Sequence, residues 1–296
     1  MSIIAQYPEF SPLSLATIQA IKNILQLLHD GISELTFGNL YFFRNFYHYK
    51  ISKFDERTLI FLGEEQKKRF FFTAGEALPA SVIQELYSQC AYWKLISESF
   101  LHKNTSLFQE LGAVPQEDRD NFDYLYTRLS LSTLSGKQLH KKKNHVNGFL
   151  NNYPDFTLKK LNDETKKDAY TILDMWAAEQ ESVQDTDYQA AKEALSLTDT
   201  ENFTGLVLYV QDTPAAWCLA ELTAQGTIAV VHFEKARTDF RGSYQYINYA
   251  FAKALPEQVI YINREQDLGD EGLRHAKMSY KPADFVKKYR LDKGAI

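Results

Sequence analysis

The chain has 296 residues, of which 45% are hydrophobic, 24% are charged and 14% are aromatic, and its formal net charge is −5. This composition excludes collagen-like, low-complexity and largely disordered chains, and the length predicts two domains. Residues 1–150 carry 16 Lys and Arg against 15 Asp and Glu, and the other 146 residues carry 17 against 23, so neither half is a basic module that binds duplex DNA through bulk charge.

The first half alternates predicted helices with short predicted strands. Apolar residues at steps of three and four predict one helix from Ser14 to just before Gly31 and another over residues 82–100. Short runs rich in aromatic and β-branched residues predict strands at 40–43, 58–62, 69–73 and 122–126. This alternation is typical of an α/β or α+β domain.

A helix is predicted at 137–153, where Leu139, Val146 and Leu150 form a narrow apolar seam. A second face beside the seam is polar and carries His140, Asn144, Asn147 and Asn151. That face could hydrogen-bond a ligand or pin one domain to the other. The lysines at 141–143 spread around the helix and cannot all face one partner. Either they are solvated, or some of them contact RNA or phosphate.

The second half has clearer signals. A cap at Asp163 or Thr165 predicts a helix through Trp176, and a polar acidic stretch follows at 180–199. Strands at 205–210, 215–222 and 227–234 are joined by turns short enough for an antiparallel meander. A helix after Gly242, a strand at 258–263 and a short helix at 271–277 complete an order that is typical of acetyltransferase-like α+β domains.

The junction before the helix at Gly242 is a candidate phosphate site. A helix N-terminus offers unpaired backbone N–H groups, and a glycine lets a phosphate approach the backbone. Arg237 and Arg241 could add charge-assisted hydrogen bonds to a pyrophosphate. The alternative is that Gly242 is only a turn residue and both arginines are solvated.

A second candidate is the polar segment 262–282, which follows a strand at its C-terminal end, where sheet folds tend to place ligand groups. Arg274 and Lys277 share a helix face, and Asp267 or Asp270 could cap that helix. The alternative is a solvated loop held by salt bridges.

Several chemistries find no support. The only cysteines, Cys90 and Cys218, are too far apart in sequence to argue for a disulfide framework or a zinc site, and His140 and His145 do not share a helix face. There is no Walker loop, nucleophile elbow or dinucleotide GxGxxG motif. With no signal peptide and no apolar span, we expect a cytoplasmic protein without a metal site.

Three segments resemble a known bacterial family. They are Glu34-Leu-Thr-Phe-Gly-Asn39-Leu-Tyr41, then Leu134-Ser-Gly-Lys137 through Lys143-Asn-His145, and finally Asn263-Arg-Glu265-Gln-Asp267-Leu-Gly269 through Leu273-Arg274 and Lys277-Met-Ser-Tyr280-Lys281-Pro282. Through them the chain resembles the proteins related to the C-terminal domain of phosphatidylglycerol lysyltransferase. The resemblance implies an α+β fold of two tandem acyl-CoA N-acyltransferase-like (GNAT-like) domains with mixed, mainly antiparallel sheets, at 1–136 and 154–296, joined by a helix at 137–153.

In such proteins an activated acyl group, carried as an aminoacyl-tRNA ester or an acyl-CoA thioester, moves to an amine or hydroxyl. The resemblance therefore implies a transferase with a tRNA or CoA co-substrate and no permanently bound cofactor. The lysyltransferase carries a membrane region before this module, and this sequence shows none, so the acceptor stays open between a small molecule, a peptide and a lipid.

The resemblance locates the site, and residue type suggests the roles. Tyr280 could protonate the leaving atom, Glu265 could orient the acceptor or take its proton, and Lys281 or backbone N–H groups could meet the oxyanion. The residues expected to hold donor phosphates are Arg237, Arg241, Gly242, Ser243 and Tyr244. The residues expected to line the cleft are His140, Asn144, Asn263, Asp267, Arg274 and Lys277.

The junction departs from the acyl-CoA pattern. Acetyltransferases usually show Gln/Arg-x-x-Gly-x-Gly/Ala there, and aligning the first Gly on Gly242 puts Asp239 and Tyr244 at the flanking positions. Tyr244 would crowd a pyrophosphate, which favours a tRNA 3′ end over CoA. The rival to any transferase is a non-catalytic binding protein that keeps the fold, for RNA or for a partner.

Overall fold

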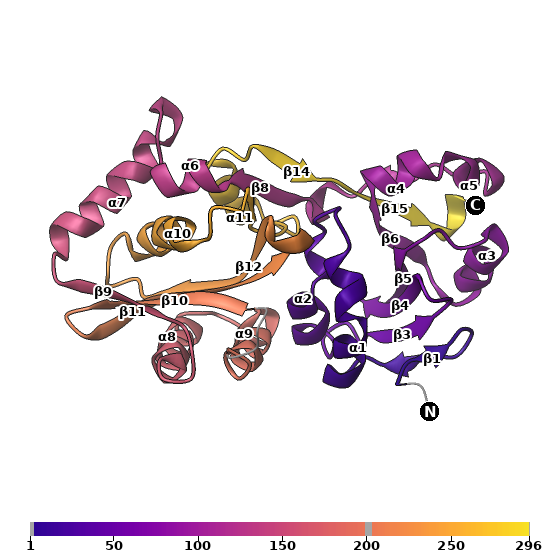
Figure 1. Ribbon diagram of the computed structural model, residues 1–296, viewed down its shortest axis with the longest axis horizontal. Helices are drawn as coiled ribbons and strands as arrows, with labels where there is room; N and C mark the ends of the chain where they lie inside the picture. The colour runs from indigo at the N-terminus through magenta and orange to yellow at the C-terminus, as the bar shows by residue number, and fades with distance from the viewer. Residues whose placement is uncertain (1–2, 199–202, 296) are drawn as a thin grey trace. The chain divides into compact units, whose positions relative to one another are not determined.

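A computed structural model describes residues 3–198 and 203–295, which form two compact units (Figure 1). The first unit consists of Met1–Asp123, Gln266–Gly269 and Phe285–Ile296, and the second of Tyr124–Glu265 and Asp270–Asp284. These units are defined by compactness, whereas the predicted bounds at 1–136, 137–153 and 154–296 describe two related folds and a linking helix. Those bounds stay a prediction.

The sheet of the first unit has the strand order β1-β3-β4-β5-β6-β15-β7, with β2 beside β3. Its strands are β1 (Ala5–Gln6), β2 (Ser11–Pro12), β3 (Lys50–Lys53), β4 (Thr58–Glu65), β5 (Lys68–Gly75), β6 (Tyr92–Ser97), β7 (Gln116–Glu117) and β15 (Lys288–Asp292). The β1–β3 and β5–β6 pairs are parallel, and the β2–β3, β3–β4, β4–β5, β6–β15 and β7–β15 pairs are antiparallel.

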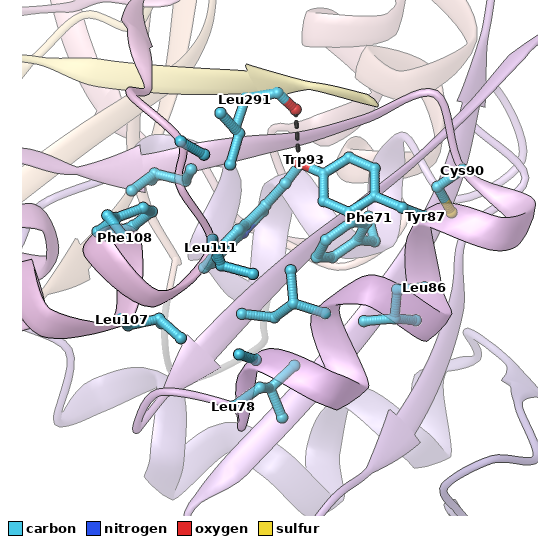
Figure 2. Packing of buried hydrophobic residues seen from close by; sticks show 14 of the residues in the cluster. Phe71, Leu78, Leu86, Tyr87, Cys90, Trp93, Leu107, Phe108, Leu111 and Leu291 are labelled. Carbon is cyan, nitrogen blue, oxygen red and sulfur yellow. Dashed lines mark hydrogen bonds between the residues drawn. The ribbon is translucent and has the colours of Figure 1, made fainter. Parts of the chain in front are cut away.

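Aromatic packing holds this unit together. Its helices are α1 (Leu15–Gln26), α2 (Phe37–Phe42), α3 (Ala80–Gln89), α4 (Glu98–Lys103) and α5 (Thr105–Glu110). Figure 2 shows the Trp93 ring of β6 between Phe71 and Phe108, with ring centroids 5.5 and 5.8 Å away. The Tyr87 hydroxyl donates to the Leu291 carbonyl at 2.7 Å, which ties α3 to the strand β15 near the end of the chain.

The core of the first unit also contains a buried lysine. The Lys288 ammonium is fully buried and lies 2.8 Å from Asp123 Oδ1, and it also pairs with Glu34. Ser33 donates its backbone N–H and its hydroxyl to Asp123 at 2.9 and 2.8 Å. The first segment of the family resemblance therefore supplies one partner of a buried charge cluster.

Two sequence predictions for the first half are wrong. The helix expected over 82–100 ends at Gln89, and residues 92–97 form β6, every residue of which is buried. Because β6 is buried on both faces, its apolar residues do not alternate with exposed ones, and Trp93 and Ile96 also match helical spacing. The strand expected at 40–43 is instead the end of α2 and its C-cap residue Phe43, because the Thr36 side chain caps a helix there by accepting the Asn39 N–H.

The sheet of the second unit has the order β14-β8-β13-β12-β11-β10-β9. Its strands are β8 (Asp123–Thr127), β9 (Phe156–Lys160), β10 (Phe203–Val210), β11 (Thr213–Thr223), β12 (Ile228–Ala236), β13 (Tyr261–Asn263) and β14 (Asp284–Val286). The predicted meander β10–β11–β12 is confirmed as antiparallel, and β13 pairs with β12 in parallel.

Helices cover both faces of this sheet. They are α6 (Arg128–Thr133), α7 (His140–Asn152), α8 (Lys166–Ala178), α9 (Tyr188–Leu195), α10 (Ser243–Ala254) and α11 (Glu271–Met278). Helices α8 and α9 lie on one face and α10 on the other, where it contacts α6 and α7 (Figure 1). The helix α9 falls inside the predicted polar stretch 180–199, whose last residue lies outside the described residues.

In the described part of the chain, no helix is both long and apolar enough to cross a membrane.

Candidate active site

The candidate site of the second unit is a fork between two parallel strands. Strands β12 and β13 pair only from Ile228 with Tyr261 to Val230 with Asn263. Strand β12 then continues to Ala236, whereas the chain leaves β13 at Arg264. Side chains that follow the last pair on both strands therefore face one another across the opening.

Glu234 and Arg264 bridge the fork with an ion pair. The Arg264 Nη2 donates to Glu234 Oε1 at 3.1 Å, and the Asn248 amide of α10 donates to Glu234 Oε2 at 3.3 Å. Burial acts to lower the pKa of Arg264, but Glu234 together with Tyr280 and Tyr126 outweighs it, so the pKa of Arg264 is raised. The guanidinium is therefore a fixed positive charge at the end of β13.

Tyr280 lies against the same guanidinium. The Arg264 Cζ is 5.0 Å from the centroid of the Tyr280 ring, and the Lys142 Nζ of α7 is 4.1 Å from it. Burial raises the pKa of Tyr280 to about 12, against the opposing effect of Arg264. Tyr280 is thus a protonated phenol at neutral pH and can donate a proton. Burial, followed by the charge of Arg264, lowers the pKa of Lys142.

Glu265 is held from the sheet side by a buried histidine. His232 Nδ1 lies 2.8 Å from Glu265 Oε1, and its Nε2 lies 3.4 Å from Glu221 Oε2 of β11. Burial acts to lower the pKa of His232, but hydrogen bonds and charge from both carboxylates raise it to about 9. At neutral pH His232 is therefore an imidazolium that donates from both ring nitrogens.

Two more of the predicted cleft residues shape the loop after β13. The fully buried Asn263 accepts the Glu265 N–H on its Oδ1 at 2.7 Å. The Lys277 Nζ donates to the Arg264 carbonyl at 2.6 Å, and the Tyr126 hydroxyl donates to the Lys277 carbonyl at 2.8 Å. These contacts fix the backbone from which Arg264 and Glu265 project.

The other predicted residues of this segment lie at different places. Arg274 is half-buried on α11, and Lys281 is exposed with a φ of 56°. Asp267 belongs to the first unit, where it accepts from Arg119 Nη1 at 3.3 Å and from the Gly269 N–H at 2.9 Å. Asp267 thus shapes a turn, and the cap of α11 is Asp270, which accepts the Leu273 N–H.

His140 and Asn144 are exposed on α7, with Asn144 Nδ2 3.4 Å from His140 Nδ1. The same helix supplies Lys142 to the Tyr280 ring. One lysine of the basic run on α7 thus reaches the Tyr280 ring, and the cleft role of His140 and Asn144 stays a prediction.

The predicted phosphate junction is closely packed. The Arg237 Nη2 pairs with Asp239 Oδ2 at 2.5 Å, and the Ser243 hydroxyl donates to the Arg237 carbonyl at 3.1 Å. Arg241 is exposed, while Tyr244 is half-buried and burial raises its pKa. Gly242 caps α10 with a φ of 92°, and a Cβ there would lie 2.9 Å from the His145 carbonyl oxygen of α7. This glycine lets α7 pass close to the start of α10.

Replacing Gly242 by Ala should therefore lower the free energy of unfolding by about 1–3 kcal/mol, because the left-handed backbone and the contact with α7 both penalise a Cβ. Urea unfolding measures the loss. Gly136→Ala, with a φ of 90° and no atom near the new Cβ, is the control for backbone strain alone. If Gly242→Ala lost no more free energy of unfolding than Gly136→Ala, the contact with α7 would add nothing to the cost of the Cβ.

Three residues in or beside the fork were not among the site residues predicted from the sequence. Glu221, His232 and Glu234 interrupt strands that are otherwise almost wholly apolar. Polar side chains at buried strand positions need partners, which is the signal that could have found them. No group of three or more His, Cys, Asp or Glu within residues 3–198 and 203–295 is arranged to hold a metal ion.

The chain is similar to known proteins in both sequence and fold. The family model for the C-terminal region of phosphatidylglycerol lysyltransferase matches residues 25–292. An uncharacterized protein of Mycoplasmoides gallisepticum is 26% identical over 171 residues, which are 56% of this chain and 54% of the relative. The aligned part of the chain thus spans about half the length of the curated relative it matches.

Three solved structures share the fold over nearly the whole chain. A conserved protein of unknown function from Bacteroides thetaiotaomicron VPI-5482 has a TM-score of 0.84 and 28% identity, covering 96% of this chain and 98% of that one. The C-terminal domain of a proposed lysylphosphatidylglycerol synthetase from Agrobacterium fabrum has a TM-score of 0.65 and 14% identity, covering 95% and 92%. A tandem GNAT protein from the clavulanic acid biosynthesis pathway has a TM-score of 0.50 and 9% identity, covering 97% and 98%. The predicted α+β fold with tandem GNAT-like domains and mixed, mainly antiparallel sheets is confirmed.

Proposed function

Since this chain belongs to the family of phosphatidylglycerol lysyltransferase C-terminal domains, we propose that it moves an activated acyl group from an aminoacyl-tRNA or acyl-CoA donor to an amine or hydroxyl acceptor. The observation that carries the proposal is the end of β13, where the carboxylate of Glu265 follows directly after Arg264, whose guanidinium contacts the protonated phenol of Tyr280. A proton acceptor, a proton donor and a positive charge are the groups that acyl transfer needs.

The reaction proceeds by attack of the acceptor nitrogen or oxygen on the donor carbonyl carbon. Glu265 takes the proton that the acceptor loses, and the bond from the carbonyl carbon to the leaving oxygen or sulfur breaks. Tyr280 gives its proton to that leaving atom and recovers one from Glu265 through solvent, so the net change is one proton moved from acceptor to leaving group. Backbone N–H groups of the fork, or Lys281, meet the developing oxyanion, with Arg264 and Lys142 adding positive charge nearby.

The packing at Gly242 favours an aminoacyl-tRNA ester over acyl-CoA. Helix α7 lies against the start of α10 at Gly242, and Arg237 is already paired with Asp239, so of the two arginines of the expected pyrophosphate site Arg241 alone is exposed. The second unit also exposes a set of lysines on α7 and on the edge strand β9 that could contact tRNA phosphates. These are Lys141, Lys143, Lys159 and Lys160.

A thermal-shift screen with mixed aminoacyl-tRNA, uncharged tRNA, acetyl-CoA and CoA tests the donor. A ligand at about 100 times its Kd stabilises the folded protein by about 2.7 kcal/mol, so we expect a clear rise in Tm with aminoacyl-tRNA. A rise with acetyl-CoA alone, abolished in Arg241→Ala, would assign CoA instead. Stabilisation by none of the four at saturating concentration would rule out both donors and favour a binding protein for some other partner.

A further inference from the structure

Three ionisable side chains from neighbouring segments form a hydrogen-bonded row across the strands of the second unit's sheet. Glu221 lies on β11, His232 on β12 and Glu265 directly beyond β13. The side chains of Glu221 and His232 are 7% and 1% exposed, and that of Glu265 is 16% exposed. This row of side chains therefore begins inside the core and ends at Glu265, its most exposed member.

A β-bulge gives His232 its position. Leu219 of β11 pairs with Phe233 and the next residue, Ala220, pairs with Val231, so His232 is an extra residue in β12. A bulged residue leaves the regular alternation of the strand, and bulges are common beside active sites, where they redirect a side chain. The bulge lies just beyond Val230, the last residue of β12 paired with β13, so it coincides with the opening of the fork.

The backbone of Glu265 is also unusual. Its φ is 56°, a left-handed conformation that non-glycine residues rarely adopt, and the Asn263 side chain holds its N–H at 2.7 Å. Such backbone strain persists where the surroundings over-determine the conformation, and it clusters at functional sites. Asn263 thus fixes the backbone of Glu265 while His232 fixes its carboxylate.

We infer that His232 is a positioning residue for Glu265, holding the carboxylate in the fork at the orientation in which it takes the proton of the acceptor, with Glu221 holding the far side of the imidazolium. The inference rests on the proposed function through the role of Glu265. His232 keeps both of its own protons during transfer, and the proton from the acceptor resides on Glu265 alone. Displacing a reacting group by about 1 Å can slow a reaction about 100-fold. We expect His232 to contribute to the rate on that scale by holding the Glu265 carboxylate in place.

The charge of His232 predicts an alkaline limit on activity. Both groups that raise its pKa to about 9 are the carboxylates at its ring nitrogens, and the uncharged rings of Phe203 and Phe233 lie beside it. The imidazolium is present at neutral pH and is lost as the pH rises through about 9. Above that pH one ring nitrogen no longer donates, so one carboxylate loses its hydrogen bond and kcat should fall.

The test is the pH profile of donor deacylation by the full chain, with mixed aminoacyl-tRNA or, if the thermal shifts select it, acetyl-CoA. For His232→Gln we expect kcat to fall about 10- to 100-fold, KM for the donor to change less than about twofold, and the alkaline limb to disappear. Asp187→Asn is the matched control, because it removes an ion pair to Lys235 of the same strand, whose ammonium lies over the Trp176 ring of α8, on the opposite face of the sheet from α10. Its profile should follow that of the wild type.

A folded His232→Gln with wild-type kcat and an unchanged alkaline limb would overturn the inference and leave the proposed function standing. If that variant does not fold, Glu221→Gln replaces it, and its alkaline limb should move to lower pH because one carboxylate that raises the pKa of His232 is gone. A limb that does not move would overturn the inference. If the wild type deacylates no donor, the proposed function fails, and NMR titration of labelled histidine still shows whether His232 keeps both protons up to about pH 9.

Discussion

Glu265→Gln is expected to slow transfer by about 100- to 10,000-fold, the range that a positioned general base contributes. Glutamine keeps the size of the side chain and can still contact His232, but it cannot take the proton of the acceptor. The fall should appear in kcat, with little change in KM for the donor, because the carboxylate acts on the acceptor rather than binding the donor. Steady-state deacylation of the donor in the presence of an acceptor measures it.

Glu257→Gln supplies the matched control, since it removes a carboxylate from an exposed position of the loop before β13. It should leave both kcat and KM close to those of the wild type. A Glu265→Gln variant that retains more than about one tenth of the wild-type kcat would show that Glu265 is not the general base.

Lys288→Met should have the largest effect on stability. The substitution leaves Asp123 and Glu34 buried without the cation that lies between them, and breaking a buried ion pair from one side costs about 3–5 kcal/mol. Urea unfolding should show this loss at neutral pH. Lys287→Met, at the next residue, removes an exposed pair with Glu98 and should leave the urea unfolding curve close to that of the wild type, because solvent screens such a pair.

The Lys288→Met loss should also shrink as the pH is lowered. Burial raises the pKa of Glu34 above its ordinary value, and Lys288 opposes this rise. Without Lys288 the pKa of Glu34 in the folded state rises further above its value in the unfolded chain. The Lys288→Met variant is therefore more stable at low pH, where Glu34 is protonated, and loses that stability as the pH rises. A loss below about 1 kcal/mol at neutral pH, or one independent of pH, would mean that water or a rearrangement replaces the cation.

The sequence predicted the second half of the chain better than the first. Short turns separate the strands of the meander β10–β12, and α10 has an apolar face that begins after a glycine, so the local signals and the tertiary structure agree there. The strand β6 is buried on both faces and has no alternation, and its apolar residues therefore also fit a helix. The helix α9 is short, and its buried residues are mostly alanines, a weak apolar signal inside an acidic stretch.

The candidate site was only partly predictable for a related reason. The family resemblance directed attention to segment 263–282, which contains Glu265 and Tyr280. Their partners on β11 and β12, Glu221, His232 and Glu234, are distant in sequence and are brought to the fork by strand pairing and by the bulge in β12. A single sequence gives no register, and a bulge shifts the register by one residue, so these contacts could not be predicted.

The loss of the acyl ester from mixed aminoacyl-tRNA, measured with the wild-type chain and with Glu265→Gln, tests the central claim most directly. Phosphatidylglycerol vesicles, a peptide with free lysine amines and water serve in turn as acceptors, and acetyl-CoA is run as the second donor. We expect the wild type to accelerate the loss of one donor above its spontaneous rate and Glu265→Gln to remove most of that acceleration. A spontaneous rate with both donors and all three acceptors, or equal acceleration by the two proteins, would contradict acyl transfer at the β12–β13 fork.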